Sequence, residues 1–222
     1  MHVAHAVLVS VLFVLVCAFD IASAIPYPFS PNHFKRECKD MFPEALGVHS
    51  QLTKPPYEIS TSDTIYDGVS HEQVTIKATG PYKINAFSLQ ARVADCSATD
   101  REEPIGYFEK EFGYDDVELI HCSGRHDSAV VSRKWKINKE NVVVRWYKPK
   151  NETRKLFFRA TIVATVNLFW MENFSDSIRS IGSNKAGQVC PVRLMAQTDG
   201  ATANSSHSFL IVAMFIYMFV FL

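Results

Sequence analysis

The chain has 222 residues, of which 47% are hydrophobic, and its 23 basic side chains equal its 23 acidic ones in number. A net charge of zero argues neither for nucleic acid as a partner nor for a solvating tail. The sequence contains no repeat and no low-complexity tract, and it is long enough for one domain with a sizeable core.

Residues 1–24 have the features of a secretory signal peptide. An apolar run at residues 6–19 is followed by Ala22-Ser23-Ala24, whose small side chains fit a signal peptidase pocket. The run is short for the roughly 30 Å of hydrocarbon in a bilayer, which argues against an uncleaved membrane anchor. The sequence therefore predicts an exported chain that begins near Ile25.

An irregular, proline-rich segment at residues 25–56 is expected to wrap over an all-β domain at residues 57–175. The central pattern is Ala86–Val93, where apolar residues alternate with Ser88, Gln90 and Arg92 as in a half-buried strand. Gly, Pro, Asn and Asp separate such runs at the spacing of a β-sandwich. The expected strands cover residues 74–78, 82–95, 106–112, 117–122, 129–137, 142–147 and 156–170.

The last of these expected strands carries apolar residues at every second position. One register would turn all of them toward the core, and a slip by one residue would expose the whole row. The row consists of Leu156, Phe158, Ala160, Ile162, Ala164, Val166, Leu168 and Trp170.

Several motifs together resemble the reeler (reelin N-terminal) domain. They are Phe87-x-Leu89-Gln90-Ala91-Arg92, Gly106-x-Phe108, Trp146-x-x-Pro149, Phe158-Arg159-Ala160-Thr161 and Phe169-Trp170. The resemblance implies an immunoglobulin-like antiparallel β-sandwich. Two positions differ from the family pattern: Ala86 stands where glycine is usual, and Ser132 stands where histidine is frequent. The family includes ferric reductases with added haem and cytochrome domains, but no such domain is recognisable here, and no cofactor is expected.

Four cysteines remain after the predicted leader: Cys38, Cys96, Cys122 and Cys190. An even number in an exported chain predicts two disulfides, and spacing alone allows three pairings. The reeler resemblance implies a bond between Cys38 and Cys122, which leaves Cys96 to pair with Cys190. The rival interpretation is a zinc site at His121, Cys122 and His126, but an oxidised Cys122 cannot supply a thiolate ligand.

The C-terminal part contains a segment at residues 176–199, which the Cys190 disulfide would tie back, and a lipid-anchor signal. Residues 209–222 form an apolar run with no polar residue after it. A polar spacer and small residues precede this run, which is the arrangement of a glycosylphosphatidylinositol (GPI) signal with attachment at Asp199 or Gly200. Residues 200–222 would then be removed. The alternative is a short C-terminal transmembrane helix.

No motif for catalysis is present. The chain lacks Gly-x-Ser-x-Gly, His-Glu-x-x-His and a phosphate-binding glycine loop, and it has no free cysteine for use as a nucleophile. Its adjacent carboxylates are expected to diverge, because consecutive residues on a strand point to opposite faces. A non-catalytic protein without a metal is predicted.

Charge is segregated along the chain. Residues 95–118 hold nine acids and two bases, whereas residues 133–159 hold ten bases and two acids. One interpretation is an exposed basic sheet face, suited to anionic glycans, lipopolysaccharide or lipids, with candidate ligand-binding residues Lys134, Lys136, Arg145 and Lys148. The other is that acidic and basic strands are neighbours and neutralise each other.

Sequons at Asn151 and Asn173 predict N-glycosylation. Two functions compete: a cell-surface module of innate defence, as in the small single-domain arthropod proteins that the chain resembles, and a cell-adhesion or matrix module. A third possibility is an accessory domain related to ferric reductases. The predicted location is the outer face of the plasma membrane.

Overall fold

The computed structural model of the chain describes residues 37–66, 71–111, 113 and 115–181. Within them, a single turn of 3-10 helix, η1 (Glu44–Leu46), precedes the strands. The strands are β1 (Tyr57–Thr61), β2 (Ile65–Tyr66), β3 (Glu72–Ala78), β4 (Ala86–Val93), β5 (Tyr107–Lys110), β6 (Val117–Cys122), β7 (Arg125–Ser132), β8 (Asn141–Tyr147), β9 (Leu156–Thr165), β10 (Leu168–Phe174) and β11 (Arg179–Ser180). No described helix is long and apolar enough to cross a membrane.

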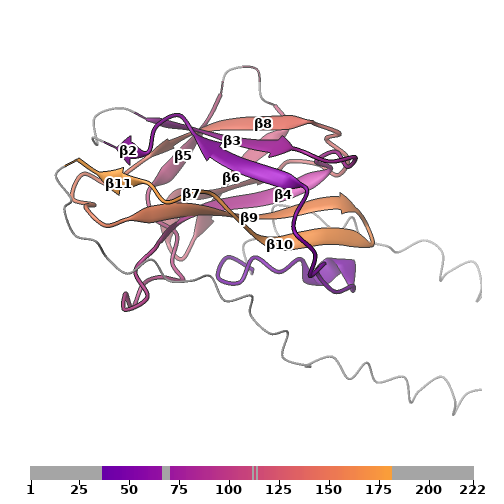
Figure 1. The fold of residues 1–222 in the computed structure, drawn as a ribbon, viewed down its shortest axis with the longest axis horizontal. Coiled ribbons are helices and arrows are strands. Elements are labelled where there is room, and N and C mark those ends of the chain that lie inside the picture. The colour runs from indigo at the N-terminus through magenta and orange to yellow at the C-terminus, as the bar shows by residue number, and fades with distance from the viewer. Residues whose placement is uncertain (1–36, 67–70, 112, 114, 182–222) are drawn as a thin grey trace, which may run out of the picture. The chain divides into compact units, whose positions relative to one another are not determined.

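The strands form two antiparallel sheets that pack face to face. One sheet has the order β1-β3-β8-β5 and the other the order β10-β9-β4-β7-β6, while β2 and β11 make a small parallel pair. Figure 1 shows β3 and β8 in one layer and β9 and β10 in the other. The main core lies between the layers and includes Phe87, Phe108, Trp146 and Phe158. The predicted all-β sandwich is confirmed.

Strand β4 lies in the middle of its sheet, as predicted, but it is not half-buried. Its residues Phe87, Leu89, Ala91 and Val93 face the main core, while Ser88, Gln90 and Arg92 point to the other face and are buried as well. The half-buried prediction was wrong because the chain before β1 covers that face.

This cover, called here the N-terminal segment (residues 37–56), contains no regular structure except η1. Its Cys38 joins a second apolar cluster, on the outer side of the five-stranded sheet, with Phe42, Leu46 and Val48 packed against it. In Figure 1 the indigo segment lies on the β10 side of the molecule, away from β3 and β8. The five-stranded sheet is therefore buried on both faces in this region.

The single strand expected at residues 156–170 is a hairpin of β9 and β10. Leu168 pairs with Thr165 across a two-residue loop, where Val166 is 45% exposed. A two-residue loop alone would reverse the alternation of faces, but a register shift between Leu168 and Phe169 restores it, so that Trp170 pairs with Ile162 and faces the main core. The period-two pattern therefore continues through the turn and hides it.

The strand expected at residues 129–137 also has different bounds. Strand β7 begins at Arg125 and ends at Ser132. Lys136 and Asn138 have φ values of 59° and 54°, which lie in the left-handed region and are incompatible with a strand. Lys134 and Lys136 therefore lie in the β7–β8 loop.

Gly106, from one of the family motifs, permits a close approach of two chain segments. Its φ is +74°, and an added Cβ would lie 2.3 Å from the carbonyl oxygen of Tyr147 and 2.6 Å from Nε1 of Trp146. That indole nitrogen donates a 2.9 Å hydrogen bond to the carbonyl of Ile105. Only glycine fits there without displacing β8.

Candidate functional site

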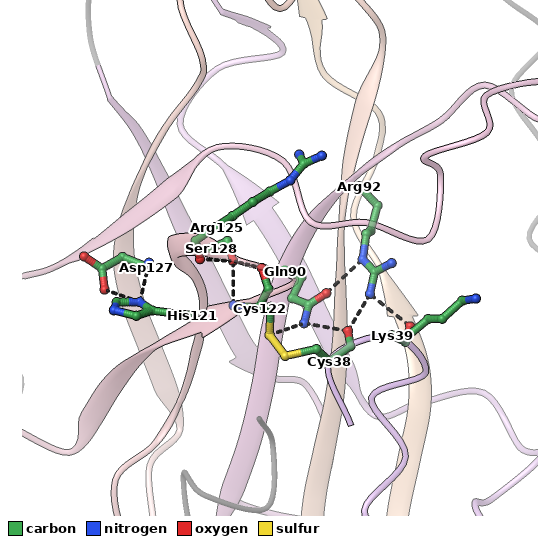
Figure 2. The surroundings of a disulfide bond; sticks show 9 residues. All are labelled: Cys38, Lys39, Gln90, Arg92, His121, Cys122, Arg125, Asp127 and Ser128. Atoms are coloured by element: carbon green, nitrogen blue, oxygen red, sulfur yellow. Dashed lines mark hydrogen bonds and ion pairs between the residues drawn. A yellow bond between two sulfur atoms is a disulfide. The ribbon is translucent and has the colours of Figure 1, made fainter. Parts of the chain in front are cut away.

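A disulfide joins Cys38 to Cys122, which confirms the pairing that the resemblance implied. The two Cα atoms are 5.4 Å apart, and the bond closes a loop with a sequence separation of 84. Figure 2 shows Gln90 beside it, donating a 3.0 Å hydrogen bond to the carbonyl of Cys38. The disulfide thus attaches the N-terminal segment to β6.

The second predicted disulfide stays a prediction. Cys96 is not a free thiol, but Cys190 lies outside the described residues. The predicted signal peptide, Asp199, Gly200 and the rest of residues 182–222 also lie outside them.

The histidines near Cys122 are held by the chain itself. The backbone amide of Asp127 donates a 3.0 Å hydrogen bond to Nδ1 of His121, and the two imidazole rings of His121 and His126 meet edge to face at 4.5 Å. Cys122 is oxidised. Among the described residues, no group of three His, Cys, Asp or Glu side chains is arranged to hold a metal ion.

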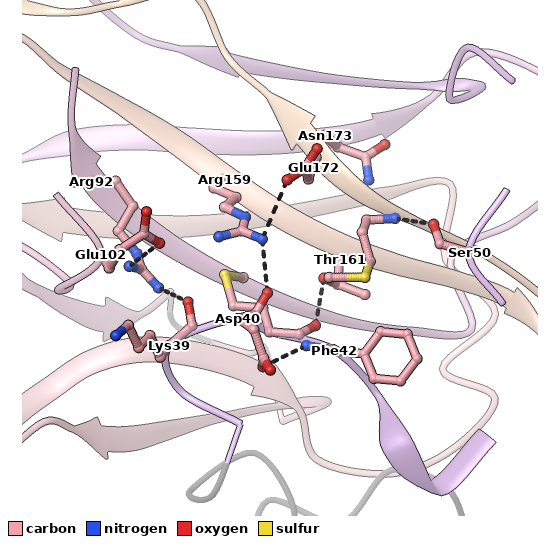
Figure 3. A network of polar contacts seen from close by, with 12 residues as sticks. Lys39, Asp40, Phe42, Ser50, Arg92, Glu102, Arg159, Thr161, Glu172 and Asn173 are labelled. Atoms are coloured by element: carbon pink, nitrogen blue, oxygen red, sulfur yellow. Dashed lines mark hydrogen bonds and ion pairs between the residues drawn. The ribbon is translucent and has the colours of Figure 1, made fainter. Parts of the chain in front are cut away.

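Two buried arginines on the five-stranded sheet hold the N-terminal segment by hydrogen bonds. The amide of Met41 donates to the carbonyl of Glu37 at 2.8 Å, which closes a single helical turn whose following carbonyls need donors. Arg92 supplies two of them, because its guanidinium donates to the carbonyls of Cys38 (2.9 Å) and Lys39 (3.0 Å). Figure 3 shows this guanidinium directed at the segment.

Strand β9 supplies the remaining donors. Arg159 donates to the carbonyl of Asp40 and Thr161 to that of Met41, each at 2.8 Å. Burial lowers the pKa of Arg92 to about 10 and also lowers the pKa of Arg159, so Arg92 remains charged at neutral pH. Arg92 of the β4 motif and Arg159 and Thr161 of the β9 motif therefore anchor the N-terminal segment.

The four predicted ligand-binding residues do not share one sheet face. Lys134 and Lys136 lie in the β7–β8 loop, whereas Arg145 lies on β8 and Lys148 follows β8. The shared face was predicted because β7 was expected to continue past Ser132. The predicted basic sheet face is therefore wrong.

Two of these residues are engaged within the fold. Nε of Arg145 lies 2.9 Å from a carboxylate oxygen of Glu111. The ammonium of Lys148 donates a 2.8 Å hydrogen bond to the carbonyl of Glu152 and lies 4.9 Å from the ring centre of Tyr66. Both cations therefore contact partners within the fold.

Neighbouring acidic and basic strands do neutralise each other in part. Strand β5 pairs with β8, and this pairing sets Glu109 opposite Arg145. Asp116, just before β6, contacts Lys134 at 2.9 Å and Lys139 at 3.1 Å. Hydrogen bonds from these two lysines hold the pKa of Asp116 below its ordinary value. One carboxylate thus serves two cations, which leaves positive charge in excess.

Four segments come together at one end of the sandwich. Ile84 in the β3–β4 loop and Lys139 in the β7–β8 loop exchange backbone hydrogen bonds of 2.8 and 3.0 Å. The ring of Tyr82, in the first of these loops, lies 5.8 Å from that of Trp170, whose indole donates to Thr53 of the N-terminal segment at 3.2 Å. This assembly, formed by residues 50–56, 79–85, 115–116 and 133–140, is called here the lysine-rich end.

The lysine-rich end carries six cations, Lys54, Lys83, Arg133, Lys134, Lys136 and Lys139, against the three acids Asp115, Asp116 and Glu140. The side chains of Lys134, Lys83 and Lys139 are 66%, 49% and 43% exposed. Sequence reasoning found only Lys134 and Lys136. It missed Lys54 and Lys83 because they come from distant parts of the chain, which only the loop contacts bring together.

The two predicted glycosylation sites differ in exposure. Asn151 is exposed in the β8–β9 turn, and its glycosylation stays a prediction. Asn173 is buried, and its side-chain amide donates to the carbonyls of Ala160 and Trp170, both at 3.0 Å. The nitrogen that would carry the glycan is occupied, so the structure contradicts glycosylation at Asn173.

Relatives of known name match most of the described residues. "Putative defense protein" of Bombyx mori is 34% identical over 147 residues, covering 65% of this chain and 81% of the relative. "Defense protein l(2)34Fc" of Drosophila melanogaster is 27% identical, covering 74% and 96%. "Putative ferric-chelate reductase 1" of Xenopus laevis is 25% identical, but the match covers only 25% of that protein.

Solved structures similar to this chain include the reeler domain of human F-spondin. The similarity covers 60% of this chain and 93% of that fragment, with a TM-score of 0.47 and 15% identity. The family model described as "Reeler domain" matches residues 36–186, which include every described residue. The chain therefore belongs to the reeler domain family.

Proposed function

We propose that the chain is a non-catalytic, extracellular recognition module of innate defence that binds anionic glycans or lipids of microbial surfaces through its lysine-rich end. Two of the insect relatives carry the name of defence proteins, which supports a defence role. The location outside the cell is supported by the disulfide between Cys38 and Cys122, because such bonds persist in oxidising compartments.

The observation that carries the binding proposal is the surplus of exposed cations on three neighbouring loops. Lys134 and Lys139 share one carboxylate, and within the described residues no ion-pair partner faces Lys136 or Arg133. Lysine ammonium groups on different loops can contact phosphate or sulfate groups spaced along one polyanion. The proposal keeps Lys134 and Lys136 as ligand-binding residues and does not include Arg145 or Lys148.

The test compares two charge-reversal variants of the full chain. Lys134→Glu with Lys136→Glu changes the lysine-rich end, while Lys39→Glu with Lys150→Glu makes the same change of net charge at exposed positions elsewhere. We expect the first variant to lose most of its affinity for lipopolysaccharide and heparin. Wild-type affinity should fall as salt rises, since screening acts over about 8 Å at physiological ionic strength.

The control variant should bind nearly as wild type, because its reversed charges lie away from the site. Equal binding by wild type and the Lys134→Glu, Lys136→Glu variant would overturn the proposal. Melting temperatures of all three proteins verify that the differences come from binding and not from unfolding, since exposed charges contribute little to stability.

A cell-adhesion or matrix role is the second candidate, because the same lysine-rich end could bind sulfated matrix glycans. Expression induced by microbial challenge would favour defence, whereas constant expression in developing epithelia or neurons would favour adhesion. The third candidate, an accessory to metal reduction, requires haem or iron absorbance in the purified protein.

Attachment by a GPI anchor at Asp199 or Gly200 is part of the proposal. If it is correct, phosphatidylinositol-specific phospholipase C should release the protein from intact cells. Retention after treatment with active enzyme would favour the C-terminal transmembrane helix instead.

A further inference from the structure

Some of the exposed large apolar side chains lie at the lysine-rich end. Of the described residues, the large apolar side chains with high exposure are Leu52, Ile65, Tyr82, Tyr107, Val166 and Ile181. Tyr82 belongs to the lysine-rich end, where its ring lies against that of Trp170. Leu52 immediately precedes Thr53, which accepts the hydrogen bond of the Trp170 indole. Tyr82 and the neighbour of Leu52 in the chain therefore both contact one tryptophan.

Val166 extends this apolar group from the β9–β10 loop. The side-chain amide of Asn85, in the β3–β4 loop, donates to the carbonyl of Ala164 near that hairpin loop. The backbone amide of Gln51 donates to the carbonyl of Phe169 at 2.9 Å, which ties the segment before Leu52 to β10. Three separate loops therefore present one large apolar side chain each at the same end of the sandwich.

Lysines accompany two of these apolar residues closely. Lys83 follows Tyr82 directly, and Lys54 lies two residues after Leu52. A lysine can extend its ammonium to a phosphate while its stem and the neighbouring apolar side chain enter a less polar layer. Tyrosine suits the boundary itself, because it has an apolar ring and a polar hydroxyl. A soluble polyanion would use only the cations of this surface.

We infer that the partner of the lysine-rich end is a membrane with an anionic surface, into whose boundary layer Tyr82, Leu52 and Val166 insert. This inference rests on the proposed function and specifies its ligand. Charge complementarity selects the surface, since each lysine near an anionic leaflet raises the affinity by roughly fivefold. The apolar side chains add a contribution that salt does not screen.

The test measures binding of the full chain to sedimented vesicles of phosphatidylcholine, with and without phosphatidylglycerol, and separately to heparin. The variant Tyr82→Ser with Leu52→Ser removes apolar side chains and keeps every charge. The control is Tyr107→Ser with Ile181→Ser; Tyr107 and Tyr82 are 42% and 41% exposed. All proteins have the same termini, so any contribution of the termini to vesicle binding is the same in each.

We expect wild type to bind the anionic vesicles and not the neutral ones. The Tyr82→Ser, Leu52→Ser variant should bind anionic vesicles at least tenfold more weakly, with unchanged heparin affinity, because it loses only apolar burial. The control should bind as wild type. A variant that binds vesicles as tightly as wild type would overturn the inference and leave the proposed function standing. Failure of wild type to bind either vesicles or heparin would overturn both.

Discussion

The N-terminal segment and the lysine-rich end both depend on cations, but the two regions use them differently. Arg92 and Arg159 are buried, and their guanidinium groups donate hydrogen bonds to the backbone carbonyls of residues 38–40. Lys134 and Lys136 are exposed, and at most one carboxylate contacts them. The positive charge of a motif therefore says little about binding until the partners of its hydrogen-bond donors are known.

The largest expected effect concerns Arg92. Replacing Arg92 with Met removes the donor from the carbonyl of Lys39 and from the side-chain oxygen of Gln90, and it leaves the carbonyl of Cys38 with Gln90 as its donor. We expect a loss of about 3–5 kcal/mol in the free energy of unfolding, measured by urea denaturation. The matched change Lys134→Met should alter stability by less than about 1 kcal/mol. Similar losses in the two variants would contradict the distinction between the regions.

The disulfide between Cys38 and Cys122 should contribute almost as much. Cys38→Ser and Cys122→Ser should each cost about 2–5 kcal/mol, because the bond constrains a long loop of the unfolded chain. The double variant should lose little beyond either single one, since both remove the same bridge. Additive losses in thermal denaturation would show that the two cysteines stabilise the protein independently of each other.

Gly106 tests the packing of the two sheets away from both regions. Gly106→Ala puts a Cβ at a φ of +74° and against the Tyr147 carbonyl and the Trp146 indole, so β8 must shift. We expect a loss of at least about 2 kcal/mol in unfolding free energy. Heparin binding measured well below the melting temperature should persist, because the lysine-rich end is not changed.

The smallest effect on stability is expected at Asp116. Its replacement should strengthen binding while it slightly weakens the fold. Asp116→Asn frees Lys134 and Lys139, so affinity for heparin should rise while the unfolding free energy falls by less than about 1 kcal/mol. The folded pKa of Asp116 is lowered, so its stabilisation is present above the ordinary carboxyl pKa of about 4 and disappears as the pH falls through the folded pKa. Stability measured against pH should lose this component in the variant. Unchanged heparin affinity would show that the two lysines do not contact the ligand.

Alternation of apolar residues was sufficient to predict the β-sandwich, the central place of β4 and the exact span of β6. It failed at Val166 because the register shift after the two-residue loop restores the period and hides the turn. It also failed at Arg92, since a charged residue at an alternate position is typical of a solvent-facing side. Only the tertiary packing of an irregular segment, which has no periodicity of its own, makes that side buried.

The candidate site was less predictable than the fold. The excess of bases at residues 133–159 was visible, but its placement depended on where β7 ends, and the backbone conformations of Lys136 and Asn138 decide that. The partner loops at residues 50–56 and 79–85 carry few charges each. Their cations become one surface only through contacts such as that between Ile84 and Lys139.

Binding of lipopolysaccharide through the lysine-rich end can be tested directly by a lysine-acetylation footprint of the full chain with and without that ligand. Because ammonium groups that contact anions react more slowly, we predict protection of Lys83, Lys134, Lys136 and Lys139. The exposed Lys39 and Lys150 should react equally in both samples. Protection at Lys39 or Lys150 together with unchanged reactivity at the lysine-rich end would contradict binding at that end.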